Sequence, residues 1–282
     1  MSLRIVHRVD APCDISRLRA GADAAGRKVS ASEISQRINP NTGALEFRAP
    51  LTWTGVRSYY HADGSVTREL RRPEQVRSPS HIRGLRLLTA TSGHPALPDG
   101  TPAYLDARGG PDVRSPDGSA LRPAEDYAIG HVGDAIEDGE IDGYYVPVAW
   151  CSITSLASQR GIAAGKTQTS LGYTALLDDT PGVWDGPHGP EQYDVEHLLD
   201  HEDARVLRAV ADGIVPTVEI LVDGVLTRVP VLGPNHYAAE IWAGRGEAQS
   251  EILDFALPAS EMPRRNADAA PARGDRKSTR LN

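Results

Sequence analysis

Cysteine and large aromatic side chains are scarce in this sequence of 282 residues. Aromatic residues make up only 5% of the chain, with two phenylalanines, and the two cysteines, Cys13 and Cys151, lie far apart. Two distant cysteines cannot form a disulfide framework or a cysteine-based metal site. An intracellular, reducing compartment is therefore expected.

Long apolar runs and an excess of positive charge are missing as well. No segment approaches the roughly 20 apolar residues of a membrane span, and residues 1–20 mix arginines with aspartates without the apolar stretch of a signal peptide. The 38 acidic residues outnumber the 30 basic ones, which gives a formal net charge of -8. We therefore expect neither a membrane partner nor direct nucleic-acid binding, because phosphate contacts need clustered lysine and arginine.

What remains is the composition of a globular chain that is long enough to bury a core. Hydrophobic residues make up 40% and charged residues 24% of the sequence. Apolar residues alternate with polar ones over residues 45–56, which predicts strands, and residues 143–150 and 167–177 are further runs of β-type composition. Residues 152–164 and 203–212 are predicted helices.

Turn-forming residues divide the rest of the chain. Two β-type runs over residues 218–229 meet at Asp223-Gly224, which predicts a hairpin. Residues 91–125 and 179–193 are rich in glycine, proline and aspartate and are predicted loops. We expect an N-terminal arm over residues 1–43, a domain over residues 44–257, and a tail over residues 258–282. The tail has few apolar residues with which to offset its ordering entropy, so it is predicted to be disordered.

Two patterns are close to known binding motifs but lack an essential feature. Gly161 and Gly165 are separated by three residues, whereas a phosphate-binding loop has four between its glycines, so a helix end is favoured. Residues 138–143 resemble the start of a calcium loop, but Ala149 stands where the bidentate glutamate is required. An exposed acidic turn before a strand is the better interpretation.

His197 and His201 form the third such pattern. Their spacing of four would place both imidazoles on one face of a helix, as in zinc peptidases. Leu198 follows the first histidine, however, where those enzymes carry glutamate. A surface helix is therefore favoured, and a metal-dependent hydrolase that uses both histidines and a carboxylate stays open as an alternative.

Three short strings with chemically capable residues follow one another along the chain. They are Ser92-Gly93-His94-Pro95, Thr169-Ser170-Leu171-Gly172-Tyr173, and Pro234-Asn235-His236-Tyr237-Ala238-Ala239 with Gly244-Arg245-Gly246 behind it. In this order they resemble the bacteriophage prohead (capsid maturation) proteases. The resemblance is closer to a branch once described as uncharacterised phage proteins, which has an early His-Pro, a Ser-x-Gly-Tyr core and a late Asn-His-x-Ala. It covers roughly residues 50–246.

The resemblance implies a serine nucleophile and a histidine base. A serine hydroxyl is a weak nucleophile at neutral pH, so it needs a base within hydrogen-bond reach and a third group that orients the base. Ser170 is the implied nucleophile, His94 the implied base and His236 the implied third member. Gly172, two residues after the serine, would tolerate an unusual φ or a close approach of substrate.

The third position distinguishes this sequence from related prohead proteases. That position is acidic in those enzymes, whereas the herpesvirus assemblins, which the family resembles in fold, use a second histidine there. A second imidazole orients the base less strongly than a carboxylate does, so slow turnover is expected. Slow turnover is tolerable for an enzyme that acts at high local substrate concentration inside a closed shell.

Alternatives to these assignments stay open at the level of sequence. His131 competes with His94 as the base, and Glu240, four residues after His236, would restore an acidic third member. Ser170 could be an ordinary strand serine, His94 a loop residue beside a turn, and His236 a structural histidine.

One departure from the family pattern concerns the segment before the third string. The stretch between Tyr193 and Asn235 is usually short in such proteins, but here it holds the predicted helix and the hairpin at Asp223-Gly224. We interpret residues 195–233, approximately, as an insertion at the barrel rim, or as a sign that the third string is misaligned.

The resemblance implies a fold and a function together. The fold is α+β and β-rich, a partly closed β-barrel flanked by helices, as in the assemblins. The function is that of a phage or prophage serine endopeptidase, acting in the host cytoplasm within the assembling prohead. Its substrates are the scaffold and major capsid proteins, with its own chain as a further candidate, and self-association is a further expectation. No cofactor or metal is implied. The alternative from another class is a catalytically silent structural or scaffolding head protein of the same fold.

Overall fold

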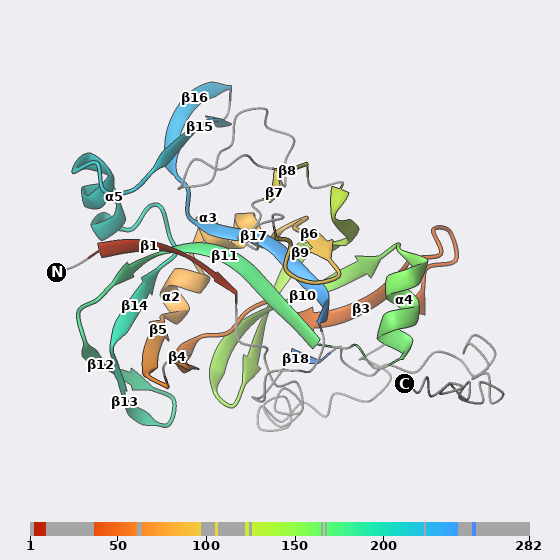
Figure 1. Ribbon diagram of the computed structural model, residues 1–282, viewed down its shortest axis with the longest axis horizontal. Coiled ribbons are helices and arrows are strands. Elements are labelled where there is room, and N and C mark those ends of the chain that lie inside the picture. The colour runs from red at the N-terminus through yellow and green to blue at the C-terminus, as the bar shows by residue number, and fades with distance from the viewer. Residues whose placement is uncertain are drawn as a thin grey trace, which may run out of the picture.

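Strands dominate the computed structural model, which describes residues 3–9, 37–60, 64–96, 105–106, 122–123, 126–164, 166, 168–222, 224–241 and 250–251 (Figure 1). Four short helices accompany them within these residues: α2 (Pro73–Val76), α3 (Pro79–Leu85), α4 (Leu156–Ala163) and α5 (Ala204–Ala211). The fold is therefore α+β and strand-rich, as the sequence predicts. The predicted disordered tail lies outside the described residues.

One large sheet of twelve strands forms the body of the molecule. Its strands are β1 (Leu3–Val9), β2 (Arg37–Ile38), β3 (Leu45–Pro50), β4 (Gly55–Tyr60), β5 (Val66–Arg71), β6 (Thr89–Thr91), β9 (Ala128–Ile141), β10 (Tyr144–Ile153), β11 (Gln168–Asp178), β14 (Val195–Leu198), β17 (Gly233–Ile241) and β18 (Ser250–Glu251). Their order is β2-β3-β10-β9-β6-β17-β11-β14-β5-β4, and β1 and β18 both pair with β11. The sheet is mixed, because β6 with β17 and β5 with β14 are parallel pairs and the other pairs are antiparallel.

Three two-stranded sheets complete the β structure of the described residues. They are β7 (Leu105–Asp106) with β8 (Arg122–Pro123), β12 (Gly182–Gly186) with β13 (Gly189–Tyr193), and β15 (Thr217–Val222) with β16 (Val225–Pro230). No pairing between described strands joins the β2 end of the large sheet to its β4 end, so a closed barrel is not observed. Within the same residues, no helix has the length and apolar character needed to cross a membrane.

Strand β11 runs through the middle of the sheet and separates two apolar clusters. Leu171, Tyr173, Ala175 and Leu177 alternate along it and point into the main core, while Leu176 faces a smaller cluster with α5. Because side chains alternate between the two faces of a strand, Ser170 and the glycine at position 172 point away from the main core.

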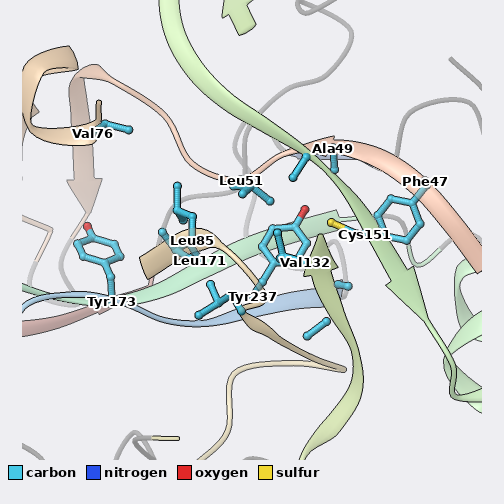
Figure 2. Close-up of a cluster of buried hydrophobic side chains, with 14 of the residues drawn as sticks. Phe47, Ala49, Leu51, Val76, Leu85, Val132, Cys151, Leu171, Tyr173 and Tyr237 are labelled. Carbon is cyan, nitrogen blue, oxygen red and sulfur yellow. The ribbon is translucent and has the colours of Figure 1, made fainter. Parts of the chain in front are cut away.

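The main core draws side chains from strands that are far apart in sequence. Figure 2 shows Phe47 of β3, Val132 of β9, Cys151 of β10 and Tyr237 of β17 gathered with Leu171 of β11. Complete burial raises the pKa of the Cys151 thiol well above its ordinary value. Cys151 is therefore a packing residue and not a thiolate nucleophile.

Both predicted helices are confirmed, with their boundaries set by capping residues. Ser155 caps α4, and residues 152 and 153 belong to β10 instead of the helix. Asp203 caps α5, where its Oδ1 accepts a hydrogen bond of 2.7 Å from the backbone N–H of Arg205. The hairpin predicted over residues 218–229 is also present as β15 and β16, and Gly224 in its turn has φ +79°.

The loop predicted over residues 179–193 is wrong, because this segment contains the hairpin of β12 and β13. Val183 pairs with Gln192 and Trp184 pairs with Glu191 across the two strands. Most of the glycines and prolines that suggested a loop surround the tight turn, where Gly189 adopts φ +110°; these are Gly186, Pro187, Gly189 and Pro190. Turn residues at the tip of a hairpin thus produced the composition of a loop.

The predicted helix that would carry His197 and His201 is wrong too. His197 lies in strand β14, and His201 lies in the turn before α5. Because β14 ends at Leu198, the two histidines belong to different elements and do not share the face of a helix.

The described parts of the predicted N-terminal arm are strands of the large sheet. Strand β1 runs antiparallel along β11, with Leu3 opposite Asp178 and Val9 opposite Gly172, and β2 pairs with β3. Leu3 and Ile5 pack against the cluster beneath α5, which anchors β1. The boundary expected at residue 43 therefore does not separate these strands from the domain.

Candidate active site

Three neighbouring elements bring the three sequence strings together. Strand β17 lies between β6 and β11, so the chain after β6, the middle of β17 and the start of β11 meet at one place in the sheet (Figure 1). Ser170 on β11 stands opposite Ala238, and Gly172 stands opposite His236. His94 follows β6, which pairs with β17 at Tyr237. Residues separated by as many as 142 positions in sequence are thereby adjacent.

The side chains of Ser170, His94 and His236 form a continuous hydrogen-bonded chain. The Nε2 atom of His94 lies 2.9 Å from Ser170 Oγ, and its Nδ1 atom lies 2.7 Å from His236 Nε2. Both distances are normal for hydrogen bonds, and the first lies within the range that a nucleophile and its base require. The two imidazoles meet edge to face, with ring centroids 5.0 Å apart and an interplanar angle of 64°.

The arrangement fixes which nitrogens carry protons when the serine is activated. If His94 accepts the Ser170 proton at Nε2, its Nδ1 atom must bear a hydrogen and donate it to His236. The Nε2 atom of His236 then acts as an acceptor and bears no hydrogen. A neutral His236 can therefore hold His94 in the tautomer that a general base needs.

The side chains of Ser170, His94 and His236 differ in how far they are exposed to solvent. Ser170 is 3% exposed and His236 is 0% exposed, whereas His94 is partly exposed. The hydrogen bond between the two histidines is thus part-buried, with its His236 end enclosed in the protein. His94 is the member that reaches toward solvent.

Gly172 provides the space that His236 occupies. A Cβ atom at position 172 would lie 2.1 Å from Cε1 and 2.5 Å from Nε2 of His236. Gly172 has no positive φ, so the reason expected from sequence, an unusual backbone conformation, does not apply. The glycine of the Ser-x-Gly-Tyr string is required because its missing side chain makes room for the imidazole on the facing strand.

The loop that carries His94 is shaped by its own neighbours. Thr91 Oγ1 donates a hydrogen bond of 2.6 Å to the carbonyl oxygen of Gly93. Gly93 has φ +153°, which residues with side chains rarely adopt. Pro95 on the other side of His94 is buried. These features direct the imidazole back over β17 toward β11.

Strand β17 carries irregular pairing on both sides of the site. Next to His236 the register shifts so that Tyr173 pairs with Pro234, which leaves Asn235 as an extra residue. Toward the other end, Gln168 pairs with Ile241 and Ser170 with Ala238, which leaves one more extra residue. Such β-bulges are common beside active sites, where they turn a side chain in a new direction.

The alternative residues considered from sequence lie elsewhere. His131 is exposed on β9, in register with Thr89 and Ser152, and the imidazole that contacts Ser170 is that of His94. The carboxylate of Glu240 lies 3.3 Å from Lys166 Nζ and close against Gly161 of α4. Glu240 thus pairs with a lysine, and the group hydrogen-bonded to His94 Nδ1 is His236.

A second chain of polar groups, which the sequence analysis missed, starts on the same strand. Tyr173 OH lies 3.2 Å from His197 Nδ1, and His197 Nε2 lies 2.5 Å from Glu69 Oε2. All three side chains are 0% exposed. Nothing in the local sequence indicated this group, because Glu69 lies on β5 and the contact forms only when β5, β14 and β11 are side by side.

His197 is therefore enclosed in the protein interior. His201 lies in the turn before α5, near the carboxylates of Asp200 and Glu202. Within the described residues, no group of three or more histidine, cysteine, aspartate or glutamate side chains is arranged to hold a metal ion. The geometry gives no support to the pairing of His197 with His201 on which the metal-dependent alternative was based.

Comparisons with protein-family models, with curated proteins and with solved structures find no match for this chain. The case for a function therefore rests on the three sequence strings and on the geometry of Ser170, His94 and His236.

Proposed function

We propose that this protein is a serine endopeptidase with Ser170 as nucleophile, His94 as general base and His236 as the residue that orients the base. The observation that carries the proposal is the continuous hydrogen-bonded chain, with distances of 2.9 and 2.7 Å, between side chains from three separate segments. Three residues picked for their chemistry from distant strings would rarely meet in this order by chance, and the order is the one that acyl transfer requires.

The chemistry follows the usual course of acyl transfer on serine. Ser170 Oγ attacks the carbonyl carbon of the scissile peptide while its proton passes to His94 Nε2. His94 gives that proton to the departing amine, and the acyl group remains on Ser170 as an ester. A water molecule then attacks the ester carbonyl while His94 takes its proton. The bond to Ser170 Oγ breaks, the carboxylic acid leaves, and His94 returns the proton to Ser170. The residues described here need no metal or cofactor for these steps.

The proposed setting follows from the resemblance to prohead proteases. The substrates would be the scaffold and major capsid proteins of a phage or prophage, cleaved in the host cytoplasm within the assembling prohead, and the chain itself is a further candidate substrate. The finer fold proposal is a partly closed, assemblin-like barrel, in which the strands from β2 to β4 curve around the main core. The α5 segment with the β15–β16 hairpin would be an insertion at its rim.

Co-incubation of the purified full chain with the scaffold and major capsid proteins of the same phage or prophage tests the proposal. We expect defined cleavage products with the wild-type chain and none with Ser170→Ala, which removes one hydroxyl and leaves the strand pairing of β11 intact. A catalytically silent head protein would leave both substrates intact even though it binds them. Products that form equally with Ser170→Ala would contradict the proposed nucleophile.

A further inference from the structure

The residue before His236 has two structural features that the proposed triad does not explain. Asn235 is the extra residue of the β17 bulge, since Gly172 faces His236 and Tyr173 faces Pro234. Its side chain is also buried, at 6% exposure. A bulge changes the direction of the side chains beside it, so the conformation at Asn235 affects where the neighbouring imidazole of His236 points.

The Asn235 amide binds the segment that continues from His94. Asn235 Oδ1 accepts a hydrogen bond of 2.9 Å from the backbone N–H of Leu105, which is itself buried. Leu105 is eleven positions after His94 and starts β7, which pairs with β8. Asn235 thus holds Leu105, at the start of β7, against β17 directly beside His236.

The NH₂ group of the same amide makes no hydrogen bond to the residues that the structure describes. Its nitrogen, Asn235 Nδ2, is buried. An unpaired buried donor weakens a fold, so an asparagine here is a poor choice on grounds of stability alone. Local departures of this kind concentrate at functional sites.

Packing holds the bulge in place from the other side. A Cβ atom at Gly84 of α3 would lie 2.9 Å from Cδ of Pro234, so the helix and the proline are in close contact. With Pro234 held by α3 and Asn235 bonded to Leu105, the backbone that enters His236 has little freedom. The position of His236 is thereby tied to the amide of Asn235 through the bulge.

We propose that Asn235 is a positioning residue that sets the distance between His94 and His236 by shaping the bulge that carries His236. The consequence for catalysis rests on the proposed function. Misplacement of reacting groups by about 1 Å reduces rates by roughly 100-fold, so loss of this amide should slow the activation of Ser170 by about 10- to 100-fold.

Three variants of the full chain separate positioning from plain stability. Asn235→Ala removes the acceptor for the Leu105 N–H, whereas Asn235→Asp keeps an oxygen at the same place and serves as the rescue variant. Thr54→Val is the matched control, because Thr54 Oγ1 donates a buried hydrogen bond of 2.7 Å to the Tyr145 carbonyl oxygen away from the triad. If Asn235→Ala does not fold, Asn235→Ser takes its place, since its hydroxyl is too short to reach Leu105.

Two readouts are measured for each variant, together with its melting temperature. The first is the rate at which diisopropyl fluorophosphate modifies Ser170, and the second is the ¹⁵N NMR spectrum of the His94 ring without any probe. We expect Asn235→Ala to lose about 10- to 100-fold in rate and to change the tautomer signals of His94. Asn235→Asp should stay within a few-fold of wild type, and Thr54→Val should lose melting temperature with an unchanged rate.

The outcomes distinguish this inference from the proposed function. A reactive wild-type Ser170 whose rate and His94 spectrum are the same in Asn235→Ala overturns the positioning role and leaves the triad standing. An unreactive wild-type Ser170 overturns the proposed function. The His94 spectrum alone then tests the positioning role of Asn235. In that case, altered tautomer signals in Asn235→Ala support the positioning role, and unaltered signals overturn it.

Discussion

Two hydrogen-bonded chains of side chains begin three residues apart on strand β11. Each consists of a hydroxyl, an imidazole and a third polar group. One runs from Ser170 to His94 and His236, and the other runs from Tyr173 through His197 to Glu69. Judged by composition alone, the second chain is the better triad, because it ends in the carboxylate that the first one lacks. The two chains differ in where their members lie.

The exposure of the histidine separates the two chains. Tyr173, His197 and Glu69 are fully buried on the core side of β11, whereas His94 is partly exposed and Ser170, although only 3% exposed, points away from the main core. A substrate cannot reach a hydroxyl in the core without unfolding it. The comparison teaches that a hydroxyl–imidazole pair is evidence for catalysis only where a substrate could approach it.

The buried chain is part of a larger polar group in the core. The Arg71 guanidinium stacks over Trp53 at 4.2 Å and over Tyr173 at 4.3 Å from the ring centroids, and it hydrogen-bonds to Thr52. Arg71 and Glu69 are both 0% exposed. The loss of one partner of a buried polar pair leaves the other uncompensated.

The largest expected difference between the two chains is the effect on cleavage of removing the hydroxyl group. Ser170→Ala should lower peptide cleavage by several orders of magnitude and cost about 1 kcal/mol or less in unfolding free energy. Tyr173→Phe should leave cleavage within a few-fold of wild type and cost about 1–3 kcal/mol, because His197 Nδ1 loses its partner. Cleavage assays and urea unfolding of both variants test this contrast, which reversed effects on activity would refute.

The third members of the two chains should differ next. Removal of the carboxylate in Glu69→Ala should lower the unfolding free energy by about 3–5 kcal/mol, because the fully buried His197 then loses the carboxylate that its Nε2 atom contacts. The folded fraction should cleave substrate at the wild-type rate, which denaturant melts combined with activity at low temperature would measure. A loss of activity in fully folded Glu69→Ala would mean that the buried chain supports catalysis.

His236→Ala should show the opposite profile. It should reduce turnover by about 10- to 1,000-fold with little change in KM, because His236 acts on the alignment of His94. Glu240→Ala, on the same strand, should be nearly silent in turnover, since its carboxylate pairs with Lys166. A severe Glu240→Ala and a mild His236→Ala on one peptide substrate would assign the third position to Glu240 instead.

The smallest effect concerns His81 of α3, a further buried histidine. Burial and, to a lesser extent, the charge of Arg71 lower the pKa of His81 to about 3, and neither ring nitrogen has a hydrogen-bond partner among the described residues. The unfolded chain binds this proton below about pH 6.5 and the folded chain does not, so stability falls as the pH drops from about 6.5 toward 3.

A substitution at the same position isolates this effect. Between pH 7 and pH 5 the contribution of His81 amounts to about 2 kcal/mol of lost stability. His81→Leu should therefore flatten the pH dependence of the unfolding free energy over this interval, while its stability at pH 7 stays equal to or above that of wild type. Parallel pH dependences for wild type and His81→Leu would show that other groups cause the acid loss.

The parts of the fold that local sequence determines were predictable. The strands around Leu45, Tyr145 and Leu171, the helices capped by Ser155 and Asp203, and the hairpin at Gly224 follow from alternation, capping and turn residues. The order of the strands was not predictable, because β11 pairs with β1, β14, β17 and β18 from distant parts of the chain.

The candidate site shows the same division. Ser170, His94 and His236 could be selected from sequence because their strings resemble those of a known family, and their residue types match a known reaction. The roles of Gly172 and Asn235 could not be derived, since both depend on which residue of the facing strand or loop lies opposite. The partner of Glu240 depends likewise on where α4 and Lys166 lie.

Fluorophosphonate labelling of the intact wild-type chain, followed by mass spectrometry of its peptides, tests the central claim most directly. We expect a single modified residue, Ser170, with a labelling rate that falls by several orders of magnitude in His94→Ala and no modification in Ser170→Ala. A folded wild-type chain that remains unlabelled, or one that is labelled at the same rate without the His94 imidazole, would contradict the assignment of Ser170 as a nucleophile activated by His94.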